Sequence, residues 1–125
     1  MNPKKDSFII NRIKSLSFAL NGIIILIKTE NSIKTHLFIS ILVIFCGLYF
    51  QISIIEWILQ TICIGVVLLT ESLNTAIERI ANFVNPDYNK DIGLIKDIGA
   101  GAVVFTVIMS AIVGILIYLP ILISL

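Results

Sequence analysis

Long apolar runs separated by short polar connections make up most of the chain. A membrane-spanning helix needs about 20 mostly apolar residues. Three segments have this character: 33–50, 54–81 and 97–119. They are connected by 51–53 and by 85–93, and in the second connection Asn85-Pro86 and Gly93 are expected to interrupt helix. The pattern predicts three transmembrane helices in a single domain.

Residues 8–28 follow a different pattern. Apolar side chains recur at helical spacing on one face, and polar side chains, among them Asn11 and Lys14, lie opposite. Such a helix is expected to lie in the membrane interface with its lysines in water. The alternative is a fourth, short transmembrane helix. Asn21 and Gly22 argue against it, because they interrupt the apolar run. We therefore expect an all-α membrane protein with an amphipathic N-terminal surface helix.

Composition supports a membrane protein. Of the 125 residues, 58% are hydrophobic and 14% charged, whereas soluble proteins are about 25% charged. The mean hydropathy is +1.04. The net charge of +1 gives no reason to expect a nucleic-acid partner. Cys46 and Cys63 lie inside apolar runs and are expected to be small buried hydrophobes, not a disulfide or a metal pair.

The basic residues predict the orientation. Six of the nine lie before or at the start of the first span, and the other three surround the second connection: Arg79, Lys90 and Lys96. Segment 51–53 carries none. Because positive charge marks the cytoplasmic side, we expect the N-terminus and the 82–96 loop in the cytoplasm and the C-terminus outside. His36, near the start of the first span, is expected to be an interfacial anchor.

A polar stripe occupies the end of the second span. Glu71, Asn74 and Glu78 are separated by three and four residues, which places them on one helix face. A helix over 54–81 is about 42 Å long, whereas the hydrocarbon core is about 30 Å thick. Glu71 and Asn74 are therefore expected at the cytoplasmic boundary of the membrane.

The other helix ends bring charge to the same level: Glu30 and Lys34, then Lys96 and Asp97. Clustered ionisable groups inside a bundle suggest a functional site, although solvated helix ends also carry charge. Carboxylates with a few cations suit Mg²⁺ and phosphates, and one carboxylate can take a proton from an attacking hydroxyl. An oligomeric proton or cation transporter, or a non-catalytic assembly subunit with the stripe between helices, is the alternative.

Three segments carry a resemblance to a known family: "GIIILIKTENSIKTHL" (22–37), "ESLNTAIE" (71–78) and "KDIGAGAV" (96–103). They resemble the bacterial small integral-membrane lipid kinases, which comprise diacylglycerol kinases and undecaprenol kinases. The resemblance extends over nearly the whole chain. It implies ATP-dependent phosphorylation of a lipid hydroxyl at the cytoplasmic face of the inner membrane, by a homotrimer with sites shared between subunits.

The resemblance also implies residue roles. Glu71 would be the general base, and Asn74 would orient the base and the substrate. Glu30 and Glu78 would hold the Mg²⁺ of Mg-ATP. The nucleotide phosphates would be contacted by Lys96, with Asp97 supporting that site.

Two positions depart from the family pattern. Asn82 stands where the family usually has Asp, and Asn11 stands where Gram-negative members have Arg. The nearest cations to Asn11 are Arg12 and Lys14, either of which is a candidate phosphate contact. Segments 28–36 and 96–103 look more like the undecaprenol kinases than the diacylglycerol kinases, and both lipids remain candidate substrates.

Overall fold

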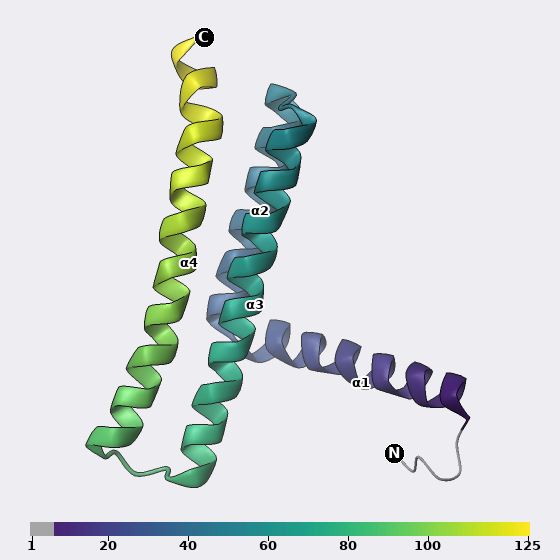
Figure 1. Ribbon diagram of the computed structural model, residues 1–125, viewed down its shortest axis with the longest axis vertical. Helices are drawn as coiled ribbons and strands as arrows, with labels where there is room; N and C mark the ends of the chain where they lie inside the picture. Colours follow the sequence, from purple (N-terminus) through teal and green to yellow (C-terminus); the bar gives the residue numbers. More distant parts are fainter. Residues whose placement is uncertain (1–6) are drawn as a thin grey trace. The chain divides into compact units, whose positions relative to one another are not determined.

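The computed structural model describes residues 7–125, and all of its regular structure is helical within that range. The four helices in chain order are α1 (Phe8–Thr29), α2 (Asn31–Phe50), α3 (Ile54–Val84) and α4 (Lys90–Ile123) (Figure 1). The chain forms two compact units that divide between Asn31 and Ser32. The first contains α1, and the second contains nearly all of α2 with α3 and α4.

Helix α1 starts and ends at well-defined caps. Ser7 is the N-cap, and its side chain accepts a hydrogen bond from the Ile10 amide. Glu30 is the C-cap, and its extended backbone ends the helix before α2 begins. No residue of α1 is buried, and α1 is long and apolar enough to cross a membrane, as are α2, α3 and α4. The placement of α1 on the membrane surface therefore stays a prediction.

A tight connection joins α2 to α3. Gln51 has a positive φ of 52°, and Ile52 turns inward to 7% exposure. Ser53 and Glu56 then form a capping box, in which each side chain accepts a hydrogen bond from the other residue's backbone amide. Gly47 packs closely against Trp57, since a Cβ added at Gly47 would lie only 2.8 Å from the indole ring. The missing side chain therefore makes room for the indole. The predicted break at 51–53 is confirmed.

The connection between α3 and α4 is shorter than the sequence predicted. Helix α3 ends at Val84, directly before Asn85-Pro86, as expected. Asn89 caps α4, and its side chain accepts a hydrogen bond from the Ile92 amide. Gly93 therefore lies inside the first turn of α4, and the prediction that it breaks helix was wrong. A helical glycine costs about 1 kcal/mol relative to alanine, which a capped 34-residue helix tolerates.

The second unit is an up-down-up arrangement in which α4 runs along α3 (Figure 1). The 51–53 connection and the C-terminus lie at one end of this unit. The 85–89 connection lies at the opposite end, where α3 and α4 extend beyond the start of α2 (Figure 1). The predicted basic residues Arg79, Lys90 and Lys96 belong to this end.

Few apolar side chains are buried within the described residues. They are Ile33, Ile52, Cys63, Val67, Ala81, Val103 and Ile117. Large aliphatic and aromatic side chains cover the outside of all four helices, far beyond the few hundred Å² that soluble monomers leave exposed. Such a surface requires lipid or other apolar surfaces around it. The predicted all-helical fold is confirmed, and its four long apolar helices fit a membrane protein. Trimer formation stays a prediction.

Candidate active site

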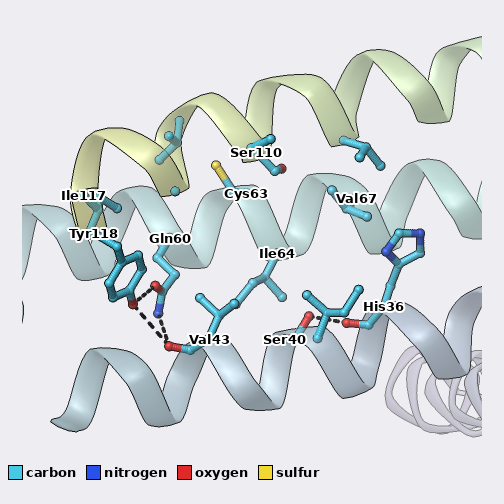
Figure 2. Close-up of a pocket in the computed structure, with 15 residues that line it drawn as sticks. His36, Ser40, Val43, Gln60, Cys63, Ile64, Val67, Ser110, Ile117 and Tyr118 are labelled. Atoms are coloured by element: carbon cyan, nitrogen blue, oxygen red, sulfur yellow. Dashed lines mark hydrogen bonds between the residues drawn. The ribbon is translucent and has the colours of Figure 1, made fainter. Parts of the chain in front are cut away.

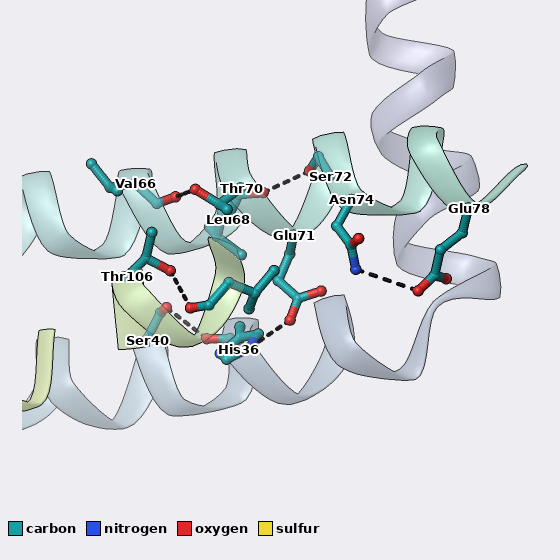
Figure 3. A network of polar contacts seen from close by, with 11 residues as sticks. His36, Ser40, Val66, Leu68, Thr70, Glu71, Ser72, Asn74, Glu78 and Thr106 are labelled. Atoms are coloured by element: carbon teal, nitrogen blue, oxygen red, sulfur yellow. Dashed lines mark hydrogen bonds and ion pairs between the residues drawn. The ribbon is translucent and has the colours of Figure 1, made fainter. Parts of the chain in front are cut away.

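The centre of the site is a buried carboxylate paired with a histidine. Glu71 of α3 is 8% exposed, and its Oε1 lies 3.1 Å from Nε2 of His36 on α2 (Figure 3). A carboxylate inside a spanning helix is costly unless it has a hydrogen-bond partner. His36 supplies that partner and fixes which carboxylate oxygen is occupied. The second oxygen, Oε2, is left to accept a further hydrogen bond or a proton.

His36 was missed as a site residue. The sequence predicted an interfacial anchor, whereas the structure gives it a specific contact with Glu71. The two residues are 35 positions apart on different helices, so no helical periodicity relates them. Ser40 supports this turn of α2, since its hydroxyl donates to the His36 carbonyl at 2.6 Å.

One turn further along α3, Asn74 and Glu78 are in contact. The Asn74 Nδ2 donates to Glu78 Oε1 at 3.4 Å (Figure 3). The Asn74 Oδ1 is buried and has no hydrogen-bond partner. Such an atom is costly to leave unsatisfied. The predicted stripe thus brings Glu71, Asn74 and Glu78 to one part of the unit.

Gly99 of α4 makes room for Asn74. A Cβ built at Gly99 would overlap the Asn74 Oδ1, and Gly99 itself is buried. The absence of a side chain at this position therefore lets α4 approach the amide closely. Gly99 lies within the 96–103 segment that carries the family resemblance, but nothing in the sequence shows that it faces Asn74.

Lys96 is held by Asn82. Its Nζ donates to the Asn82 Oδ1 at 2.6 Å, joining the last turns of α3 to the first turns of α4. Asn82, one of the two positions that depart from the pattern of the resembled family, thus has a specific partner on α4. Asp97, next to Lys96, is exposed.

The remaining predicted site residues belong to the first unit. Glu30 is the half-buried C-cap of α1. The Arg12 guanidinium lies 5.7 Å from the centre of the Phe8 ring, and Lys14 is exposed. That these residues meet Glu71 and Glu78 stays a prediction.

The side chains of the second unit fit a loosely held Mg²⁺. Among residues 7–125, no three His, Cys, Asp or Glu side chains come close enough to form a metal cage. Mg²⁺ usually keeps several waters and binds one or two carboxylates together with substrate phosphates. The half-buried Glu78 carboxylate could supply one oxygen ligand of that kind, whereas the neighbouring Asn74 presents its Nδ2 donor to that carboxylate.

A largely apolar cavity begins beside this site. It has a volume of about 360 Å³ and lies between α2, α3 and α4, from His36 at one end to Tyr118 at the other (Figure 2). The fold and the site therefore define a small helical membrane protein with a buried, hydrogen-bonded carboxylate next to a hydrocarbon-lined cavity.

Comparison with known proteins identifies the family. The profile of the prokaryotic diacylglycerol kinases matches residues 17–118. The chain belongs to this family, and it is a lipid kinase. It is 36% identical over 107 residues to the undecaprenol kinase of Bacillus subtilis (strain 168), a match that covers 86% of this chain and 87% of that protein. It is 29% identical over 116 residues to the diacylglycerol kinase of Synechocystis sp., covering 92% of this chain and 66% of that protein.

Proposed function

We propose that this kinase transfers the γ-phosphoryl group of ATP to a lipid hydroxyl, with undecaprenol preferred over diacylglycerol. The observation that carries the proposal is Glu71, a buried carboxylate held by His36 at the end of an apolar cavity. The preference for undecaprenol is supported by the undecaprenol kinase relative, which is the more similar and the more fully covered of the two relatives described.

The side chains suggest a direct transfer. The lipid hydroxyl oxygen attacks the γ-phosphorus of ATP while the Oε2 of Glu71 accepts the hydroxyl proton. The bond between the γ-phosphorus and the bridging oxygen breaks, and ADP leaves with that oxygen. His36 keeps the carboxylate oriented. Asn74, whose amide nitrogen donates to Glu78, would orient the base and the substrate. Placing the reacting groups in this way supplies most of the catalysis in phosphoryl transfer.

The nucleotide is proposed to bind at the water-facing end of the same stripe. Glu78 would hold Mg²⁺ together with Glu30, and the bound metal would neutralise charge on the phosphates. Lys96, held by Asn82, would contact the phosphates, with Asp97 beside it and with Arg12 or Lys14 from α1.

The membrane arrangement is proposed from the distribution of charge. Arg79, Lys90 and Lys96 belong to the 85–89 end of the second unit, and the 51–53 end has no basic residue. We propose that the 85–89 end lies on the cytoplasmic side of the inner membrane and that α1 lies on the membrane surface. The exposed apolar faces of α2, α3 and α4 support association, for which we propose a homotrimer with shared sites.

The proposed function is tested by phosphate transfer in reconstituted vesicles. Purified protein with Mg-ATP labelled at the γ-phosphate is assayed side by side with undecaprenol and diacylglycerol. Labelled undecaprenyl phosphate is expected to form fastest. Absence of labelled lipid, together with ion flux in vesicles that contain the protein, would instead support a transporter that uses Glu71 and Glu78.

Replacing His36 should slow the reaction through Glu71. Because hydrogen bonds to charged groups contribute about 1.5–3 kcal/mol, His36→Phe is expected to lower kcat about 10-fold to 100-fold. The KM for ATP should not change, and His36→Gln, which keeps a side-chain N–H, should recover part of the loss. Steady-state kinetics on all three proteins checks this, and equal losses in the Phe and Gln variants would contradict a positioning role.

Replacing Asn82 should weaken nucleotide binding through Lys96. Loss of one hydrogen bond of about 0.5–1.5 kcal/mol predicts that Asn82→Ala raises the KM for ATP about twofold to tenfold with little change in kcat. In a Lys96→Ala background, Asn82→Ala should have no further effect, because the two residues act as one unit. Additive effects in the double variant would show that Asn82 acts independently of Lys96.

A further inference from the structure

The end of the cavity opposite the site is closed by a polar cluster within the spanning part of the bundle. Gln60 of α3 is only 4% exposed. The Tyr118 hydroxyl of α4 donates to the Gln60 Oε1 at 2.5 Å and lies 3.2 Å from the Val43 carbonyl oxygen of α2 (Figure 2). The Gln60 Nε2 donates to the same carbonyl at 3.4 Å. One residue from each helix thus contributes to this cluster, which we call the Gln60–Tyr118 end wall.

Between the end wall and the site, the cavity is lined by apolar and small side chains. Val67 and Cys63 line the α3 side, and Ala111 and Gly114 line the α4 side. From Gln60 to Glu71, α3 rises about 16 Å. His36 lines the cavity at the site end and contacts Glu71. The site end of the cavity therefore lies one side chain away from the Glu71 carboxylate.

A hydrocarbon chain is the occupant that fits this space. The volume of about 360 Å³ lies within the range of small-molecule sites, and the lining is mostly apolar, with a few polar side chains such as Ser40 and Ser110. A polar ligand would leave its groups unsatisfied against the apolar wall. A lipid whose hydroxyl lies at Glu71 would have the start of its chain beside His36, at the end of this space.

We infer that the Gln60–Tyr118 end wall sets the length of lipid chain that the kinase accommodates between its helices. The inference rests on the proposed function, since it assumes that the lipid hydroxyl lies at Glu71. Chain atoms up to the wall pack against α2, α3 and α4, and each contact adds a little dispersion energy. Atoms beyond the wall must leave sideways into the bilayer, where they gain no further contact with this cavity.

The first test is the dependence of KM on chain length. A series of lipid alcohols with increasing chain length is assayed with the full-length protein in vesicles. The concentration of each alcohol, and so its KM, is expressed as a mole fraction of the total lipid. KM should fall with length and then level off where the chain reaches Tyr118. Tyr118→Ala opens the wall, so KM should continue to fall for longer chains. Tyr118→Phe keeps the ring and should level off at the wild-type length.

A second variant keeps the inference testable if Tyr118→Ala does not fold. A Cβ at Gly114 would meet no atom within 4 Å, so Gly114→Leu projects into the cavity without a backbone clash. It should make KM level off at a shorter chain. Gly65→Leu is the matched control, because Gly65 also has open space around it and does not line the cavity. An unchanged length profile in both Tyr118→Ala and Gly114→Leu would overturn the inference.

Chain binding is also measured without catalysis. The chain has two cysteines, of which Cys46 is exposed and Cys63 is buried in the cavity wall. In a Cys46→Ser variant without ATP, a long-chain lipid alcohol should slow the reaction of Cys63 with a small thiol reagent. Equal protection by lipids that lack a hydroxyl, or by raising the protein concentration alone, would overturn the inference.

The two measurements separate this inference from the proposed function. Phosphate transfer without Cys63 protection and without a length limit would overturn the inference and leave the kinase reaction intact. Cys63 protection that is specific for lipid alcohols, but without phosphate transfer to any of them, would overturn the proposed reaction and support the cavity as a chain-binding site.

Discussion

Glu71→Gln is expected to lower phosphate transfer to the lipid about 100-fold to 10,000-fold, because general-base catalysis contributes an effect of this size. The amide has the size of the carboxylate and can still contact His36, but it cannot take the proton of the lipid hydroxyl. ATP binding should therefore persist. Transfer rates from labelled ATP and nucleotide binding, measured on the same preparation, check both parts.

Glu56→Gln is the matched control for this substitution. It makes the same chemical change on the same helix, at the 51–53 end of α3. The amide oxygen of Gln can still accept the hydrogen bond from the Ser53 amide, as in other capping boxes. Activity should stay within about twofold of wild type, since capping changes of this kind affect stability by about 1 kcal/mol or less. A Glu71→Gln protein that keeps a tenth of wild-type activity would remove Glu71 as the base.

Gly99→Ala is expected to lower kcat about 100-fold, because an added Cβ would overlap the Asn74 Oδ1 and displace the amide. A shift of about 1 Å in a positioning group has effects of this size. Overpacking should also destabilise the protein by about 1–3 kcal/mol. Rates and thermal unfolding of the purified variant measure the two effects.

Gly101→Ala tests the specificity of that prediction. It lies on the same helix, and its added Cβ meets no atom within 4 Å. It should keep its activity, and it should gain about 0.4–1 kcal/mol of stability because alanine is favoured over glycine in helices. A double variant provides the final control: if Gly99→Ala acts through Asn74, then adding it to Asn74→Ala should cause no further loss of kcat. Equal losses in the two glycine variants would contradict the contact.

The exposed apolar side chains and the buried polar side chains need different surroundings. Exposed leucine, isoleucine and phenylalanine side chains on α2, α3 and α4 are satisfied by lipid. Buried polar groups such as Gln60 and Glu71 have no such solvent and must find partners within the protein. The polar contacts of this bundle are therefore few and specific, and they hold α2, α3 and α4 in register at the site and at the end wall.

The helices, their approximate ends and the stripe followed from the sequence because these features depend on neighbouring residues. Apolar length predicts a span, Asn85-Pro86 ends a helix, and the spacing of Glu71, Asn74 and Glu78 places them on one face. Gly93 was assigned wrongly because a glycine lowers helix propensity by too little to end a helix that Asn89 has capped.

Only the tertiary structure shows which residues of the other helices contact that stripe. His36 contacts Glu71, Gly99 makes room for Asn74, and Asn82 holds Lys96, in each case between different helices. The meeting of Gln60, Tyr118 and the Val43 carbonyl is of the same kind. Periodicity describes which residues share a face of one helix. Which faces of two helices meet, and at what register, depends on how the whole bundle packs.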